Sequence, residues 1–207
     1  MLTFFSIHDT FLNNFYNLGG FYMKDLETNR LILRKFKETD VDDMYEIASD
    51  HNIEEHSFFA EHSIFCGLNS KEETLRVIES AIQDYGTYES CWAIELKETN
   101  KVIGHIRIDH CSLKNRQCTL IWSISQKYWG LGYIEEILKT LFKYLFENHP
   151  FDIIVVRYYS DSEFSNPVLI SAGMQRDAVL RYRRINSNTG KKESLVVYSI
   201  LKEEVTW

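Results

Sequence analysis

A short segment with two glycines, Tyr128 to Tyr133 (YWGLGY), constrains the fold more than any other part of this sequence. An apolar, strand-like run from Thr119 to Ile124 precedes it, and an amphipathic, helix-like run from Glu135 to Asn148 follows it. Glycines between a strand and a helix form a turn whose main-chain N–H groups can point at an anion, with the positive end of the helix dipole behind them. The segment therefore predicts a strand, an anion-binding loop and a helix.

Two glycines in a turn do not by themselves identify a ligand, because many such turns are plain connections between elements. A dinucleotide-binding fingerprint needs a third glycine, but Glu135 stands at that position. A P-loop needs Gly-Lys followed by Ser or Thr, which this loop lacks. The loop also follows several predicted strands, so it does not belong to a first β–α–β unit. On these residues alone, anion binding and a plain turn both stay open.

The composition indicates a globular chain with one domain. The 207 residues are 44% hydrophobic and 26% charged, which suits a single domain with a sizeable core. No apolar run approaches the roughly 20 residues that a membrane helix needs. The net charge of −7 argues against nucleic acid as the main partner. We therefore expect neither a membrane nor a nucleic-acid partner.

The cysteines and histidines match no common metal site. The four cysteines include no Cys-x-x-Cys pair, which leaves zinc and thioredoxin-type chemistry unsupported. The segment from His51 to His56 resembles the metalloprotease pattern His-x-x-Glu-His but has one residue too many, and residues five apart lie about 140° apart around a helix. We expect no bound metal, and a reduced, cytoplasmic environment for the cysteines.

Residues 1 to 22 differ in character from the rest of the chain. They are rich in Phe and Asn and have neither a basic n-region nor a small-residue cleavage site, so they match a signal peptide poorly. Gly19 and Gly20, just upstream of Met23, can be encoded by a purine-rich ribosome-binding sequence. We expect native translation to begin at Met23, with residues 1–22 as a leader and residues 23–207 as one domain. A genuine extension that packs on the surface is the alternative.

The remaining patterns predict an α+β chain with mostly antiparallel strands. Helices are expected at residues 39–49, 70–85, 135–148 and 165–172. Strands are expected at residues 29–37, 91–97, 101–109, 115–125, 151–159, 179–185 and 194–201. Ser70 to Glu73 reads as a capping box, and residues 186–190 as a hairpin turn. The step from strand 115–125 through a helix to strand 151–159 predicts a parallel pair of strands.

Several segments occur in an order and spacing that together identify a family. They are LETNRLILR at 26–34, VIGHI at 102–106, the YWGLGY loop, SNPVL at 165–169 and AGM at 172–174. This arrangement resembles the GCN5-related N-acetyltransferase (GNAT) superfamily, and within it the branch of the ribosomal-protein N-acetyltransferases. The resemblance covers roughly residues 24 to 202. It implies a mixed, mostly antiparallel sheet of six to seven strands flanked by about four helices.

The resemblance also implies acetyl-CoA as co-substrate. In this superfamily acetyl-CoA lies between two strands that splay apart, the loop N–H groups bind its pyrophosphate, and its pantetheine arm pairs with the strand before the loop. That strand ends here at Trp122-Ser123-Ile124. Main-chain N–H groups polarise the thioester carbonyl. The implied cofactor-binding residues are Ser123, Ile124, Trp129, Gly130, Leu131, Gly132, Tyr133, Ile134 and Ser162.

Three positions of the loop depart from the family pattern. Ile134 stands where Gly or Ala is usual, and its bulk could crowd the pyrophosphate. Glu135 stands where Thr or Ser is usual, and its carboxylate would repel a pyrophosphate if it turned inward. Leu131 replaces a residue that is often basic. These departures bear on the affinity for coenzyme A rather than on the fold.

The resemblance assigns the catalytic residues less fully. Ser165 matches the serine that protonates the departing thiolate in relatives, and it could equally be the N-cap of the following helix. Ser162 replaces an asparagine, and Thr119 stands nearest to a glutamate that is common in the branch. The loop at 50–62 borders the acceptor site in relatives. Its candidate bases are Glu54, Glu55, His56, Glu61 and His62, although it could be a solvated acidic loop and the amine could lose its proton to water.

The function implied by the resemblance is transfer of acetyl from acetyl-CoA to a primary amine. The acceptor would be a protein or peptide N-terminus or a small-molecule amine, and the enzyme a monomer or homodimer. The alternative is a catalytically weakened module of the same fold that binds an acyl-CoA or a protein partner. A basic segment, Arg181 to Arg184 with Lys191 and Lys192, reads as a solvated strand face that could also line the acceptor groove or meet an acidic partner.

Overall fold

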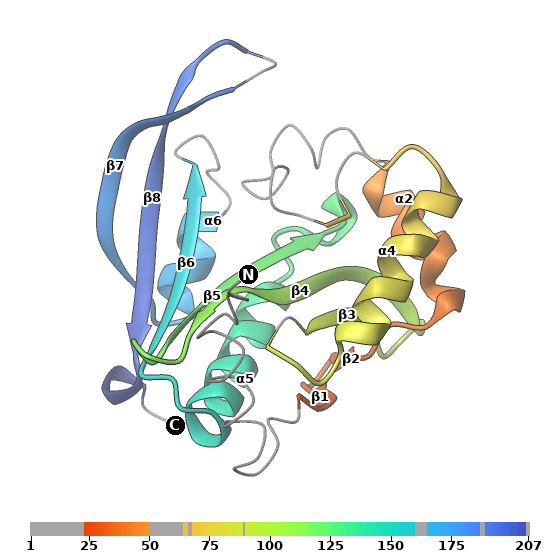
Figure 1. Ribbon diagram of the computed structural model, residues 1–207, viewed down its shortest axis with the longest axis horizontal. Coiled ribbons are helices and arrows are strands. Elements are labelled where there is room, and N and C mark those ends of the chain that lie inside the picture. The colour runs from red at the N-terminus through yellow and green to blue at the C-terminus, as the bar shows by residue number, and fades with distance from the viewer. Residues whose placement is uncertain are drawn as a thin grey trace, which may run out of the picture.

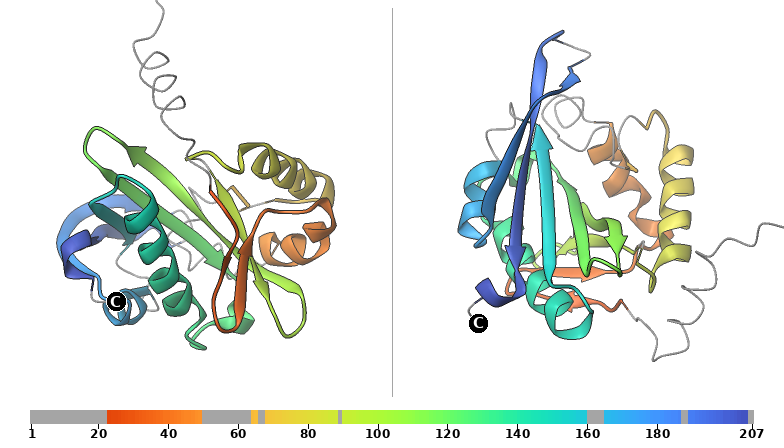
Figure 2. Two further views of the ribbon diagram at one scale, coloured as in Figure 1. Left: turned by 90° about the horizontal axis from the view of Figure 1, so that it is seen from below. Right: turned by 60° about the vertical axis from the view of Figure 1, so that its left-hand side comes forward.

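The centre of the molecule is one eight-stranded sheet with helices on both faces (Figures 1 and 2). The computed structural model describes residues 23–49, 64–65, 68–88, 90–159, 165–186 and 189–205. The strand order is β1-β2-β3-β4-β5-β6-β8-β7. The strands are β1 (Leu26–Glu27), β2 (Leu31–Arg34), β3 (Cys91–Leu96), β4 (Lys101–Ser112), β5 (Gln117–Ile124), β6 (Ile153–Tyr159), β7 (Gln175–Ile185) and β8 (Lys192–Leu201).

The sheet has one strand more than the six to seven expected from the sequence. The additional strand is β1, which has two residues and pairs with β2 through Leu26 with Leu33 and Glu27 with Ile32. Two residues are too few for an alternating pattern, so only the pairing reveals the strand. Neighbouring strands are antiparallel except for β5 and β6, which form the predicted parallel pair.

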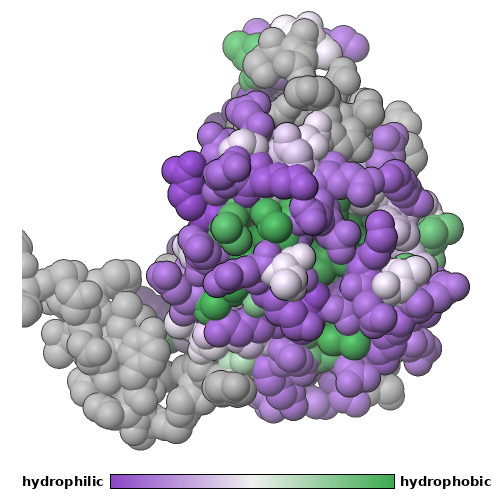
Figure 3. Space-filling model, turned by 90° about the vertical axis from the view of Figure 1, so that its right-hand side faces the viewer, coloured by the Kyte–Doolittle hydropathy of each residue, from purple (hydrophilic) through white to green (hydrophobic). Residues whose placement is uncertain are grey.

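Among the described residues, two helices cover each face of the sheet. They are α2 (Val41–Ala48) and α4 (Lys71–Asp84) on one side, and α5 (Tyr133–Asn148) and α6 (Ser165–Ser171) on the other. Short 3₁₀ turns are η1 (Glu38–Asp40), η2 (Gln126–Tyr128) and η3 (Lys202–Glu204). At the start of α4, Ser70 Oγ accepts from Glu73 N at 3.2 Å, which confirms that half of the predicted capping box. The outer side of α2 and α4 is largely hydrophilic (Figure 3).

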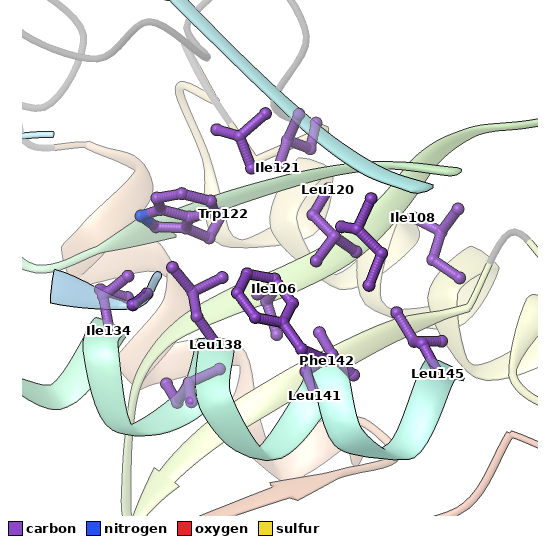
Figure 4. Close-up of a cluster of buried hydrophobic side chains, with 14 of the residues drawn as sticks. Ile106, Ile108, Leu120, Ile121, Trp122, Ile134, Leu138, Leu141, Phe142 and Leu145 are labelled. Atoms are coloured by element: carbon purple, nitrogen blue, oxygen red, sulfur yellow. The ribbon is translucent and has the colours of Figure 1, made fainter. Parts of the chain in front are cut away.

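Alternation along the strands divides the buried residues into two clusters. Trp92 and Ile94 of β3 face α5, whereas Cys91 and Ala93 face α2 and α4. The α5 side is the larger cluster, and the helix packs one continuous apolar stripe against the sheet (Figure 4). That stripe comprises Ile134, Ile137, Leu138, Leu141, Phe142 and Leu145. Each such side chain contributes about 1.5–3 kcal/mol on full burial, so this stripe fixes α5 on the sheet.

Candidate active site

Strands β5 and β6 run side by side for only three residue pairs and then separate. The last registered pair is Thr119 with Val155, although β5 continues to Ile124 and β6 to Tyr159. Beyond that point β5 stays paired with β4 and β6 stays paired with β8, so the sheet divides into two diverging halves (Figure 1). The edge of β5 that faces the gap offers main-chain groups to which an extended ligand can pair.

The end of β5 is held against β4 by a glycine. A Cβ atom placed on Gly104 would lie 2.2 Å from Ser123 O and 2.8 Å from Ile124 Cα. Both neighbours are main chain and cannot move aside, so only glycine permits this approach. Just beyond, Ser125 N donates to Ile103 O at 2.9 Å. Gly104 thereby sets the direction in which β5 enters the glycine loop.

The loop between β5 and α5 is the one predicted from the two glycines. Gly130 and Gly132 have φ of 74° and 76°, in the left-handed region that favours glycine. The Trp129 indole Nε1 donates to Ile124 O at 2.9 Å and so fastens the loop to the end of the strand. Leu131 projects outward and is 50% exposed.

A row of main-chain donors lies along this loop. Within the described part of the chain, the N–H groups of residues 130 to 135 have no hydrogen-bond acceptor. Gly132 is the N-cap of α5 and brings no side chain to satisfy the first turn. Successive free donors at the start of a 16-residue helix, with the positive end of the helix dipole behind them, are suited to an anion.

The turn between β1 and β2 anchors the loop from outside. The Glu136 carboxylate accepts from Thr28 Oγ1 at 2.5 Å, from Arg30 N at 2.8 Å and from Arg30 Nε at 2.7 Å. Arg30 Nη1 donates to Leu131 O at 3.0 Å, and the guanidinium lies 4.3 Å from the centre of the Tyr133 ring. Sequence reasoning missed this role because it joins residues more than 100 positions apart.

Two residues that depart from the family pattern have their side chains outside the loop. Ile134 is 9% exposed and packs in the core beside Leu138 and Trp122 (Figure 4). The Glu135 carboxylate bonds to Lys139 Nζ at 2.6 Å, one turn farther along α5. Hydrogen bonds from Lys139 and then from Ser171 lower the pKa of Glu135. Neither side chain is directed at the row of N–H groups.

The predicted catalytic residues are placed only in part. Glu54, Glu55, His56, Glu61, His62 and Ser162 lie outside the described residues. Ser165 is the first residue of α6, and its roles as general acid or helix cap stay predictions.

The sheet face toward α2 and α4 carries two arginines near the gap that sequence reasoning missed. Arg107 of β4 lies opposite Ile121 of β5 and donates to Asp109 Oδ1 at 2.7 Å. Arg157 of β6 donates to Thr119 Oγ1 at 3.2 Å. Alternation along each strand places them on this face, a signal that becomes readable only once the pairing of β4, β5 and β6 is known.

A neutral histidine lies beside them. His105 is fully buried, faces Ser123 across the β4–β5 pair, and its ring lies 4.9 Å from that of Phe65. Burial, and secondarily the charge of Arg107, lower the pKa of His105 to about 3. The imidazole is therefore uncharged near neutral pH.

Comparison with known proteins places the chain in a family. A family model described as the acetyltransferase (GNAT) domain matches residues 30–175. The chain belongs to the GNAT family, and the predicted superfamily and enzyme class, an acetyltransferase, are confirmed. The uncharacterized N-acetyltransferase YoaA of Bacillus subtilis is 27% identical over 185 residues, which cover 86% of this chain and 96% of that protein.

Solved structures share the fold at lower identity. A GNAT acetyltransferase from Bacillus anthracis matches with a TM-score of 0.72 and 22% identity, over 86% of this chain and 99% of that chain. RimL, the ribosomal L7/L12 alpha-N-protein acetyltransferase in complex with coenzyme A, matches with a TM-score of 0.70 and 14% identity, over 86% and 98% of the two chains. Within the described residues, no helix is both long and apolar enough to cross a membrane.

Proposed function

We propose that this protein transfers the acetyl group of acetyl-CoA to a primary amine. The observation that carries the proposal is the row of free N–H groups at residues 130–135, which lies at the end of β5 where that strand parts from β6. Main-chain donors suit a pyrophosphate, and the open strand edge suits the amide groups of a pantetheine arm. RimL, a relative of the same fold, is described as a complex with coenzyme A.

The chemistry required of the chain is modest. The amine nitrogen attacks the thioester carbonyl carbon once it has lost its proton, the C–S bond breaks, and the departing thiolate takes up a proton. Ser165 is the proposed donor of that proton. The chain must hold both reactants in line, and a main-chain N–H beside the carbonyl oxygen stabilises the charge that develops there.

The acceptor and the assembly belong to the proposal as well. A protein N-terminus and a small amine both offer the required nucleophile, and a monomer or a homodimer could present the site. A cytoplasmic location and the leader at residues 1–22 stay predictions. Ile134 and Glu135 are departures from the family pattern that would favour a weakened binding module if their side chains opposed the cofactor, but both side chains turn away from the loop. We therefore favour the hypothesis of an active enzyme over that of a binding module.

Titration calorimetry with acetyl-CoA tests the proposal. We expect micromolar affinity, and no binding at millimolar acetyl-CoA would overturn it. An assay of a panel of amines, in which the release of free CoA is measured, then distinguishes an active enzyme from a binding module.

A matched pair of glycine variants tests whether the loop is the binding site. Gly132 and Gly190 both have positive φ, 76° and 67°, so alanine is strained at either position. Gly132→Ala introduces its methyl group at the loop, whereas Gly190→Ala introduces it into open space on the β7–β8 hairpin. Similar losses of stability are expected, with weaker acetyl-CoA binding for Gly132→Ala alone. Equal affinity in the two variants would place the cofactor elsewhere.

A further inference from the structure

Arg157 lies at the point where β5 and β6 separate. Its neighbours Val156 and Tyr158 are buried toward α5, so by alternation Arg157 faces the opposite side of the sheet, toward α2 and α4. It is two residues beyond Val155, the last β6 residue that pairs with β5. Its Nη2 donates to the hydroxyl of Thr119, the partner of Val155 in that last pair. The guanidinium thus stands beside the opening of the gap.

The environment of Arg157 differs from that of comparable arginines. Four arginines in the described residues are buried or half-buried, and three of them pair with a carboxylate at 2.5–2.8 Å: Arg34 with Asp40 and Glu95, Arg107 with Asp109, and Arg184 with Glu193. Arg157 is the fourth, and no carboxylate of the described residues lies within 4.0 Å of it. A half-buried cation normally has an anionic partner, because removing it from water is costly.

We propose that Arg157 binds an anionic group, a carboxylate or a phosphate, carried by the acceptor amine. Guanidinium presents paired donors in a plane that match either group. Arg107, on the same face of the sheet, is already paired with Asp109, so Arg157 is the cation there that remains available to an anionic ligand among the described residues. The inference rests on the proposed acetyl transfer, and it narrows the acceptor to amines that also carry an oxyanion, such as amino acids or amino phosphates.

Position supports an acceptor ligand over the coenzyme. The pyrophosphate donors at residues 130–135 follow the far end of β5, whereas Arg157 contacts Thr119, five residues before that end. At about 3.3 Å per residue, five residues of strand separate the two sites by roughly 16 Å. One anion held at each end of β5 would leave the thioester end and the amine between them.

A role for Arg157 in polarising the thioester carbonyl makes a different prediction. In that case its replacement slows transfer to every amine by the same factor. A binding site for the acceptor's anion instead gives a loss that is confined to anionic acceptors and appears mainly in KM.

Three matched pairs of amines test the proposal: glycine with methylamine, phenylalanine with 2-phenylethylamine, and phosphoethanolamine with ethanolamine. Within each pair only the carboxylate or phosphate differs. In the wild type we expect kcat/KM for the anionic member of at least one pair to exceed its neutral partner by about tenfold or more, the worth of one charge-assisted hydrogen bond. The first two pairs report a carboxylate site and the third a phosphate site.

Substitutions of Arg157 test whether this residue causes the preference for anionic amines. Arg157→Gln should lower kcat/KM for the anionic member of a pair far more than for the neutral member and so abolish the preference, and Arg157→Lys should retain part of it. Arg176→Gln, on the exposed edge strand β7, is the control and should retain all of the preference.

Equal kcat/KM within all three pairs, or an equal loss for both members in Arg157→Gln, would overturn the proposal while the proposed acetyl transfer remained intact. If no amine turns over, titrating the acetyl-CoA complex with the same pairs gives the same comparison in affinity, with equal affinity again counting against it. Failure of acetyl-CoA to bind would instead refute the proposed function itself.

Discussion

Replacing Glu136 by glutamine should weaken the contact between the glycine loop and the β1–β2 turn. The carboxylate meets three donors, from the Thr28 hydroxyl and from Arg30 N and Nε. Glutamine offers one oxygen instead of two, and its NH₂ group must face a donor. Hydrogen bonds to a charged acceptor are worth about 1.5–3 kcal/mol each and neutral ones about 1 kcal/mol. The Arg30 side chain is 45% exposed, so solvent screens its ion pair, which is worth about 0–1 kcal/mol.

The expected loss for Glu136→Gln is therefore about 2 kcal/mol, or about 4–8 °C in Tm for a chain of this size. The adjacent Glu135→Gln is the control, because Glu135 pairs with Lys139 on its own helix and with Ser171 of α6 and, among the described residues, forms no hydrogen bond or ion pair with the β1–β2 turn. Its loss should be about 0.3–0.5 kcal/mol. Urea unfolding of both variants measures the difference, and acetyl-CoA titration should show weaker binding for Glu136→Gln alone. Equal destabilisation of the two variants would refute the assignment of Glu136 as the anchor of the loop.

The same anchor has a signature in pH. Burial raises the pKa of Glu136, but the hydrogen bonds from Thr28 and Arg30 outweigh it, so the folded value lies below the ordinary 4.5. A group with a lowered folded pKa adds stability that is fully present above the unfolded value and lost as pH falls through the folded value. The difference in stability between wild type and Glu136→Gln should accordingly shrink below pH 4.5. A difference that stays constant to pH 3 would contradict it.

Four further predictions follow from other contacts. Gly104→Ala should lower the free energy of unfolding by about 1–3 kcal/mol and weaken acetyl-CoA binding, since its methyl group would lie 2.2 Å from Ser123 O. Urea unfolding measures the loss, and an unchanged midpoint would mean that β4 and β5 can move apart at little cost. Arg34→Leu should cost about 3–5 kcal/mol, because it leaves the carboxylates of Asp40 and Glu95 buried without their cation; thermal unfolding measures this. Burial lowers the pKa of His149 from 6.5 to about 4. Between these two pH values the histidine is protonated in the unfolded chain but neutral in the folded one, so the stability of the fold decreases as the pH falls through this range. His149→Phe should flatten the decline by up to about 1.4 kcal/mol per pH unit, as urea midpoints at several pH values would show. Glu135→Thr should leave acetyl-CoA affinity unchanged in calorimetry because its carboxylate points along α5, and tighter binding would show that it opposes the phosphates.

The secondary structure was largely predictable because its signals are local. Alternation and helical periodicity depend on neighbouring residues. In the part of the chain that the structure describes, they located every strand except β1 and all four helices. Strand β7 begins at Gln175 rather than at Val179 because it is an edge strand with mostly exposed residues, so alternation is weak at its start. Leu180 and Arg184 flank a shift in the β7–β8 register, where Tyr182 has a φ of 53°. Such an irregularity leaves no periodic trace in the sequence.

The main-chain geometry of the candidate site was predictable from the sequence, whereas its long-range side-chain contacts were not. Two glycines between a strand and a helix predict free main-chain N–H groups, whatever the surrounding side chains are. The orientation of Glu135 was also available, because Lys139 four residues on is a favourable helix partner. The contacts of Glu136 with Thr28 and of Arg157 with Thr119 join distant segments, and only the folded sheet brings them together.

The difference between main-chain and side-chain contacts explains how the loop tolerates its departures from the family pattern. If the pyrophosphate is held by main-chain N–H groups, the side chains at 131, 134 and 135 are free to vary as long as they point elsewhere. Leu131 projects to solvent, Ile134 fills the core, and Glu135 pairs with Lys139. What must be preserved is the path of the backbone, which depends on Gly104, Gly132 and the Arg30–Glu136 contact. Specificity for the acceptor has no such main-chain basis, because it needs side chains such as Arg157, and those can change without disturbing the fold.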